Sequence, residues 1–167
     1  MPADSDGMRK ERVDTASRVI RAPPQAIYRA FLSADAWTVW LPPAGMSARM
    51  QRFEPWSGGR YRMILTYDHP DHAAPGKTSA DSDVVNGRFV EFVTDRRVVQ
   101  EVEFASDDPA FAGVMRMTWS LRAAGNGTEV RMRCRRVPEG IRAEDHRAGM
   151  RSSLENLAAF VEAESCS

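Results

Sequence analysis

The sequence predicts one α+β domain, in which a curved antiparallel sheet of about six to seven strands wraps around a long C-terminal helix, with two short helices after the first strand. Three observations predict this fold. A short strand runs through a double proline into an amphipathic helix, alternating apolar and polar segments follow, and a long helical pattern closes the chain. A helix cannot touch a curved sheet along its whole length, so we expect a cavity between the two.

The first strand leads into two short helices. Pro23 and Pro24 end the strand, because proline cannot donate to a strand ladder, and they set φ for the first turn of the helix that follows. Apolar residues then recur at helical spacing, namely Ile27, Phe31 and Leu32. Trp37 and Trp40 are three residues apart, which puts both on one side of a second short helix. That side must be covered by other parts of the domain.

The rest of the chain predicts six further strands and the closing helix. The expected strands are 46–53, 60–67, 83–93, 97–104, 115–122 and 130–135. Residues 68–82 have two prolines and almost no large apolar side chain, so we expect a mobile loop that covers one end of the cavity. The closing helix, from about 141 to 164, is expected to pack onto the sheet through one apolar stripe. This stripe consists of Met150, Leu154, Leu157 and Val161.

The expected 97–104 strand carries two glutamates. Glu101 and Glu103 alternate with apolar residues, so both are expected on the outer face of the sheet. Arg131, Arg133 and Arg135 are their expected partners, and exposed pairs of this kind add at most about 1 kcal/mol each. The alternative is a pair of acid and base groups in a catalytic site.

Composition narrows the class of protein. Lys plus Arg and Asp plus Glu are each 23, so the net charge is zero, which argues against a binder of nucleic acid or of anionic membranes. The 2 cysteines, Cys134 and Cys166, support neither a disulfide framework nor a structural zinc site. No apolar run approaches a membrane span, and no signal-peptide core is evident. We expect a cytoplasmic protein with a disordered tail at 1–14 and one domain at 15–164.

Several segments carry a resemblance to a known family. They are VIRAPPQAIYRAF, FEPWSGGRYRM, NGRFVEFVTDRRVVQ, GTEVRMRC and GMRSSLENLAAFVE. Over roughly residues 16–163 the chain resembles the START-like, helix-grip superfamily often called SRPBCC, and within it the branch of homologues of the activator of the heat-shock chaperone ATPase. Where that family often has Gly-Trp at the start of the last helix, this chain has Gly149 and Met150. A flexible thioether in place of a rigid aromatic ring is expected to reshape the pocket mouth.

The resemblance implies a fold and a range of functions. Members of the superfamily bind hydrophobic or aromatic small molecules in the cavity, and some relatives cyclise polyketides. Three functions follow as alternatives: a binder of such a molecule, a cofactor-free enzyme of the polyketide cyclase or hydrolase kind, and a protein-interaction module like a chaperone co-factor. No motif for a cofactor is present, so none is expected. The sequence leaves open whether the domain forms a homodimer.

The candidate ligand-binding residues are apolar and aromatic side chains, with one histidine, expected on the inner faces of the strands and helices. They are Trp37, Trp40, Tyr61, Met63, Met117, Trp119, Met132, His146, Met150 and Leu154, and Trp56, Tyr67 and Met115 belong to the wider set. The alternative for the whole set is ordinary packing in the core.

The histidines suggest one candidate for catalysis and no metal site. His69 and His72 lie in the motif DHPDH, whose loose spacing and central proline favour a solvated loop over a metal site. His146 precedes Met150 by one helical turn, so it is expected on the side of the helix that faces the sheet. A histidine at the cavity entrance would suit a general base. The alternative is a capping or surface histidine in the first turns of the helix.

Overall fold

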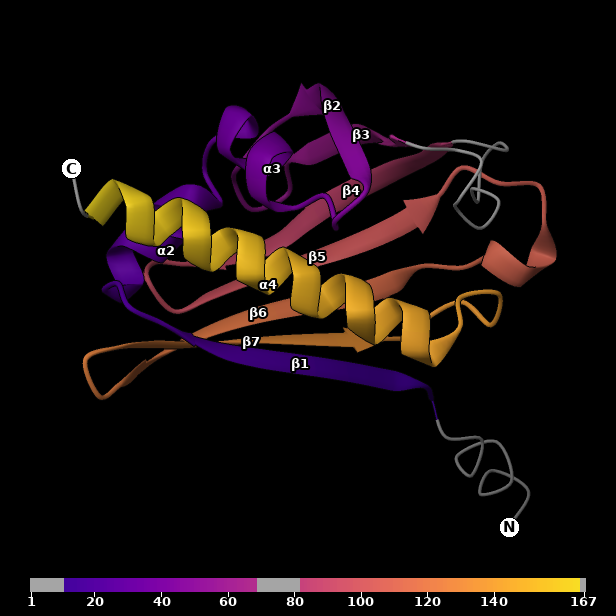
Figure 1. Cartoon of the computed structure of the whole chain (residues 1–167). Helices are drawn as coiled ribbons and strands as arrows, with labels where there is room; N and C mark the ends of the chain where they lie inside the picture. The colour runs from indigo at the N-terminus through magenta and orange to yellow at the C-terminus, as the bar shows by residue number, and fades with distance from the viewer. Residues whose placement is uncertain (1–10, 69–81, 166–167) are drawn as a thin grey trace, which may run out of the picture.

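In the computed structural model, which describes residues 11–68 and 82–165, a seven-stranded sheet wraps around a long C-terminal helix (Figure 1). The elements in order are β1 (Val13–Ile20), α2 (Pro24–Ala30), α3 (Ala34–Trp40), β2 (Met46–Phe53), β3 (Arg60–Tyr67), β4 (Ser82–Val93), β5 (Arg97–Phe104), the 3-10 turn η2 (Pro109–Phe111), β6 (Met115–Ala124), β7 (Gly127–Arg135) and α4 (Ala143–Ser165). The predicted α+β fold, with its two early helices and closing helix, is confirmed.

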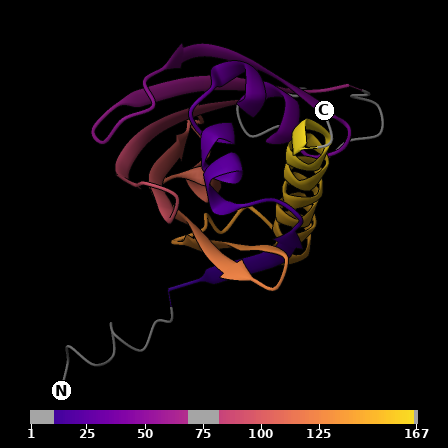
Figure 2. The ribbon, with the colours of Figure 1, turned by 90° about the vertical axis from the view of Figure 1, so that its left-hand side faces the viewer.

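All neighbouring strands in the sheet are antiparallel, in the order β1-β7-β6-β5-β4-β3-β2. Strands β2 to β7 follow one another as a meander, and β1 pairs with β7, so the first and last strands of the chain are neighbours. Figure 2 shows the sheet curving around α2, α3 and α4. All three helices therefore lie on the concave side of the sheet.

Local sequence explains how α2 and α3 are built. Pro24 occupies the first turn of α2, where its missing N–H removes no helical hydrogen bond. The side chain of Ser33 caps α3 by accepting a hydrogen bond from the backbone N–H of Ala36, at 3.2 Å. The indole N–H of Trp37 donates to the carbonyl of Phe31, at 3.0 Å. This bond ties α3 back onto the end of α2.

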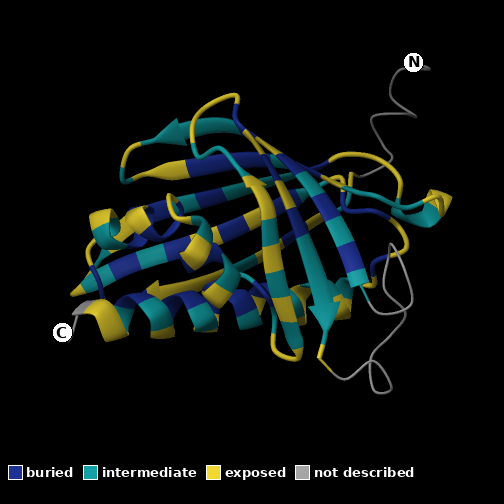
Figure 3. Cartoon of the chain, turned by 90° about the horizontal axis from the view of Figure 1, so that it is seen from above, coloured by how far each residue is buried: buried dark blue, intermediate teal, exposed yellow. Residues whose placement is uncertain are grey.

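The core lies between α4 and the concave face of the sheet. The predicted stripe of α4, Met150, Leu154, Leu157 and Val161, is at most 2% exposed. Around Phe31, the rings of Trp37, Trp40 and Trp119 lie with centroids 5.0 to 6.1 Å away, mostly edge to face. Buried and exposed positions alternate along the strands, and α4 keeps one exposed side (Figure 3). The predicted packing of the helix on the sheet is thus present.

The N-terminal boundary differs from the prediction. β1 begins at Val13, two residues before the expected start of the domain, and Val13 pairs with Arg135 of β7. Asp14 is 1% exposed, because β7 and α4 cover it. The polar character of this segment suggested a tail, but the strand forms because β7 offers it a free edge.

The partner expected for Glu101 is also corrected. β5 lies between β4 and β6, so the arginines of β7 are one strand too far away. Glu101 instead pairs with Arg88 of β4, at 3.0 Å, and Arg135 pairs with Glu11, at 2.8 Å. The expectation of a mobile loop at 68–82 falls almost entirely outside the described residues.

Candidate ligand-binding site

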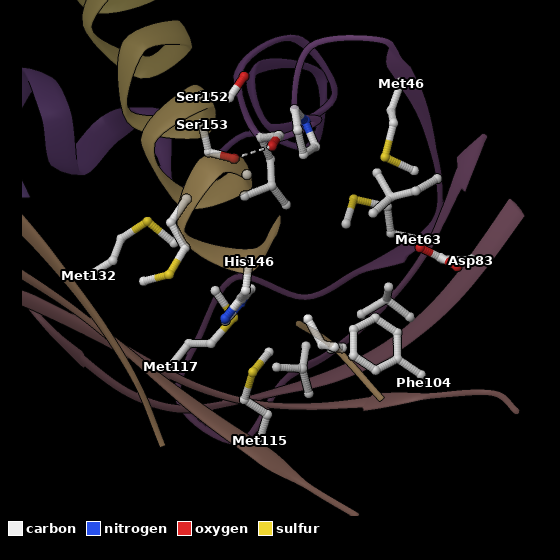
Figure 4. A pocket seen from close by; sticks show the side chains of 18 of the residues that line it. Met46, Met63, Asp83, Phe104, Met115, Met117, Met132, His146, Ser152 and Ser153 are labelled. Carbon is white, nitrogen blue, oxygen red and sulfur yellow. Dashed lines mark hydrogen bonds between the residues drawn. The ribbon is translucent and has the colours of Figure 1, made fainter. Parts of the chain in front are cut away.

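A cavity of about 500 Å³ lies between α4, the loop after α3 and the concave face of the sheet. Its volume is within the usual range for small-molecule pockets. Six methionines line it, namely Met46, Met63, Met115, Met117, Met132 and Met150. Figure 4 shows the first five of these arranged around the space beside α4. Because the thioether is flexible and polarisable, such a wall adapts to apolar molecules of different shape.

Seven of the ten residues chosen from the sequence line the cavity. They are Trp37, Tyr61, Met63, Met117, Met132, His146 and Met150, and Tyr67 and Met115 of the wider set join them. The other three of the ten, Trp40, Trp119 and Leu154, do not line the cavity, contrary to the prediction. They are buried in the core beside the cavity, where Trp40 packs on Trp119 with ring centroids 5.4 Å apart. Trp56 is 57% exposed in the turn between β2 and β3.

A buried chain of hydrogen bonds crosses the inner face of the sheet at the cavity. The indole N–H of Trp119 donates to Oε1 of Gln100, at 2.7 Å, and Nε2 of Gln100 donates to the hydroxyl of Tyr61, at 2.9 Å. All three side chains are at most 3% exposed. Burial raises the pKa of Tyr61, so its hydroxyl keeps its proton at neutral pH.

A second polar cluster stands at the N-terminal end of α4. Nδ1 of His146 lies 2.7 Å from Oδ2 of Asp14, and Arg12 donates to the same carboxylate oxygen at 2.9 Å. The Arg12 side chain also donates to the carbonyls of Pro138 and Ile141, which holds the segment before α4 against β1. In Figure 4 the ring of His146 projects from α4 toward Met117. The helical spacing thus predicted the position of His146, but its partner on β1 was assigned to the tail.

The charge on Asp14 is set by opposing effects. Burial raises the pKa of its carboxyl group, whereas the hydrogen bonds and charges of Arg12 and His146 together lower the pKa by more. The net result is a pKa below the ordinary value, so Asp14 is ionised at neutral pH. An anionic partner fixes the orientation of the His146 ring.

Three hydrogen bonds join α4 to the loop after α3 beside the cavity. The hydroxyl of Ser153 donates to the carbonyl of Leu41, at 2.6 Å (Figure 4). The amide of Asn156 donates to the carbonyl of Pro42, at 2.9 Å, and the hydroxyl of Ser152 accepts from the backbone N–H of Ala44, at 2.8 Å. These bonds satisfy two carbonyls and one N–H of the loop beside an apolar space.

Sequence reasoning missed several residues of the wall. Gln100 and Asp83 both line the cavity and are 1% exposed. Gln100 lies two residues from both Val98 and Val102 on β5, so it shares their face of the strand. Its inward direction could therefore have been inferred from the period of two. No comparable signal marked Asp83, because it lies at the start of β4, directly after a segment of polar sequence.

The described residues were also compared with the requirements of a metal site and of a membrane-spanning helix. Across residues 11–68 and 82–165, no group of three or more His, Cys, Asp or Glu side chains is arranged to hold a metal ion. His69, His72 and Cys166 lie outside these ranges. No helix in the described ranges has the length and apolar character needed to cross a membrane.

Comparison with known proteins identifies the family. The model of the family described as "Activator of Hsp90 ATPase homolog 1-like protein" matches residues 21–162, which is most of the chain. The chain belongs to this family. The resemblance drawn from the sequence motifs is therefore confirmed. A comparison with curated proteins found no match.

Three solved structures of other bacterial proteins have a similar fold to this member of the Hsp90 ATPase activator homologue family. A protein from Chromobacterium violaceum is 30% identical, covers 90% of this chain and 96% of its own, and has a TM-score of 0.78. A protein from Mesorhizobium loti is 22% identical, with coverage of 90% and 97% and a TM-score of 0.67. A protein from Staphylococcus epidermidis is 15% identical, with 93% coverage of each chain and a TM-score of 0.71. The last two are similar in fold alone.

Proposed function

We propose that this domain binds an apolar or aromatic small molecule in the cavity between α4 and the sheet. The observation that carries the proposal is the cavity of about 500 Å³ with six methionines in its wall. A well-packed core contains few voids larger than a water molecule, so a space of this size within a sheet and helix scaffold is typical of a ligand site.

The distribution of exposed apolar residues supports the cavity over a protein-binding surface. Among the described residues, the large hydrophobic side chains that are exposed are Val13, Val19, Leu32, Val39, Trp56 and Val114. They come from separate parts of the chain, namely β1, the region of α2 and α3, the turn after β2 and the segment before β6. An interaction surface is instead marked by one contiguous apolar patch, which residues spread along the chain in this way do not by themselves define. The interaction-module alternative therefore has less support.

Two measurements test the proposed binding. Native mass spectrometry of the purified protein looks for a molecule that copurifies with it. Equilibrium dialysis then measures binding of 2-isopropenylnaphthalene, a hydrocarbon probe. Met117→Trp fills part of the cavity and is expected to weaken binding of the probe at least about tenfold. Thr118→Trp places the same bulk on the opposite face of β6 and serves as the control. Absence of binding to the wild type, or equal binding by both variants, contradicts the proposal.

One observation favours the enzyme alternative. His146 lines the cavity and is held by Asp14, which is the arrangement that orients a general base. A suitable probe reaction is the hydrolysis of 2-naphthyl acetate. If this alternative holds, His146→Gln lowers turnover by at least about a hundredfold, in the range of general base catalysis. Equal hydrolysis by the variant and the wild type contradicts it and leaves the binding proposal intact.

A further inference from the structure

We infer that the cavity selects ligands that carry a neutral hydrogen-bond acceptor, such as a ketone oxygen, which the hydroxyl of Tyr61 binds. This inference rests on the proposed ligand binding and names the ligand class for the same cavity. It comes from the direction of each hydrogen bond in the chain from Trp119 through Gln100 to Tyr61.

The amide of Gln100 fits its two partners in one orientation only. An indole N–H can only donate, so the atom of Gln100 that lies 2.7 Å from Nε1 of Trp119 must be its oxygen. The other end of the amide is then the NH₂ group, which can only donate. This group lies 2.9 Å from the hydroxyl oxygen of Tyr61.

The orientation of Gln100 fixes the direction of the Tyr61 hydroxyl. The Tyr61 oxygen accepts from Gln100, so the tyrosine proton must point elsewhere. Within residues 11–68 and 82–165 no side chain or backbone acceptor receives that proton, and Gln100 likewise keeps a second N–H. Both residues line the cavity and are nearly fully buried, at 3% and 1% exposure. A ligand acceptor in the cavity completes the network.

The charges in the wall decide that this acceptor is neutral. The residues that line the cavity within the described ranges include Asp83 and Asp145 but no lysine or arginine. A carboxylate or phosphate ligand would enter an apolar space with these acidic neighbours and with no lysine or arginine among the described wall residues. His146 also lines the wall, but it is already paired with the carboxylate of Asp14, so the charge of the ligand would stay uncompensated. A ketone or similar carbonyl oxygen on an apolar body needs only the hydrogen bond that Tyr61 offers.

A matched pair of probes tests the inference. 2-Acetylnaphthalene and 2-isopropenylnaphthalene have nearly the same shape, but only the first has a carbonyl oxygen. We expect Tyr61→Phe to weaken binding of the ketone about 2- to 12-fold relative to the hydrocarbon, the net worth of one hydrogen bond. Tyr28→Phe removes a hydroxyl from a residue outside the cavity wall and is expected to leave the ratio unchanged.

The infrared carbonyl stretch of the bound ketone gives a second measurement on the wild type, which does not depend on the variant folding. A frequency lower than in an apolar solvent supports the hydrogen bond. If both probes bind and Tyr61→Phe changes neither their ratio nor the carbonyl frequency, the inference is wrong and the binding proposal stands. A ratio that changes in Tyr67→Phe instead also overturns it. If neither probe binds to the wild type, the binding proposal itself fails, and the inference fails with it.

Discussion

The ring of Tyr61 lies directly over Gly87, its register partner on the neighbouring strand β4. A methyl group added at Gly87 would lie 2.1 Å from Cε1 and Cζ of the ring and 2.6 Å from the hydroxyl oxygen. The absence of a side chain at this position therefore lets the ring lie across the sheet and reach Gln100 on β5. The two segments that supported the family resemblance, GGRYRM and NGRFVEF, meet at this contact.

Gly87→Ala is expected to lower the free energy of unfolding by about 1 to 3 kcal/mol, because Tyr61 must move off the sheet. Chemical denaturation measures the change. Gly149→Ala is the matched control, since an added methyl there meets only Cγ of Pro43 at 3.7 Å, and alanine favours a helix. A Gly87→Ala protein as stable as the wild type would contradict the close contact.

Leu157→Ala is expected to lower the free energy of unfolding by about 2 to 5 kcal/mol, because Leu157 is fully buried between α4 and the sheet. Leu32→Ala removes the same atoms from a residue that is 38% exposed, and we expect a smaller loss. Equal losses in the two variants would argue against the packing of α4 described above.

The paired state of Asp14 predicts a pH dependence of stability. Its pKa is lowered from the ordinary value of 3.8 in the folded protein, so its ionised form contributes stability above that pH. This contribution is lost as the pH falls through the folded pKa. The groups that face Asp14 are Arg12, directly before β1, Cys134 on β7 and His146 on α4.

Asp14→Asn removes this carboxylate and tests the prediction. Above pH 5 the variant is expected to be less stable than the wild type, and the difference in the free energy of unfolding should shrink as the pH falls below 3.8. Denaturation at several pH values measures it, and acidic groups common to both proteins cancel in the difference. A difference that stays constant over this range would contradict the assigned role of Asp14.

Cys134 is expected to resist thiol reagents in the native protein. Burial, with a contribution from the charge of Asp14, raises the pKa of its thiol to about 12, and the residue is fully buried on β7. The thiolate is the reactive form, so little of it exists at pH 8. In a Cys166→Ser variant, a thiol-reactive dye should label the protein only after denaturation. Rapid labelling of the native variant would count against this burial.

Much of the fold followed from local patterns in the chain. The period of two in β3, β6 and β7 predicted the strands and their apolar faces, and the stripe through Leu154 and Leu157 predicted the face of α4. These patterns are local because side-chain direction in a strand or helix depends on backbone geometry alone. They also placed His146 on the side of α4 that meets the cavity.

Alternation along a strand tells which face a side chain occupies, but not whether that part of the face meets a helix or an open space. Met117 and Trp119 share one face of β6, yet only Met117 lines the cavity. Strand order, which put Arg88 beside Glu101, was likewise outside what alternation encodes. Asp14 and His146 are separated by 132 positions in the chain and meet only because β1 forms the edge of the sheet beside α4. Such contacts depend on the packing of whole elements, so only the tertiary structure could decide them.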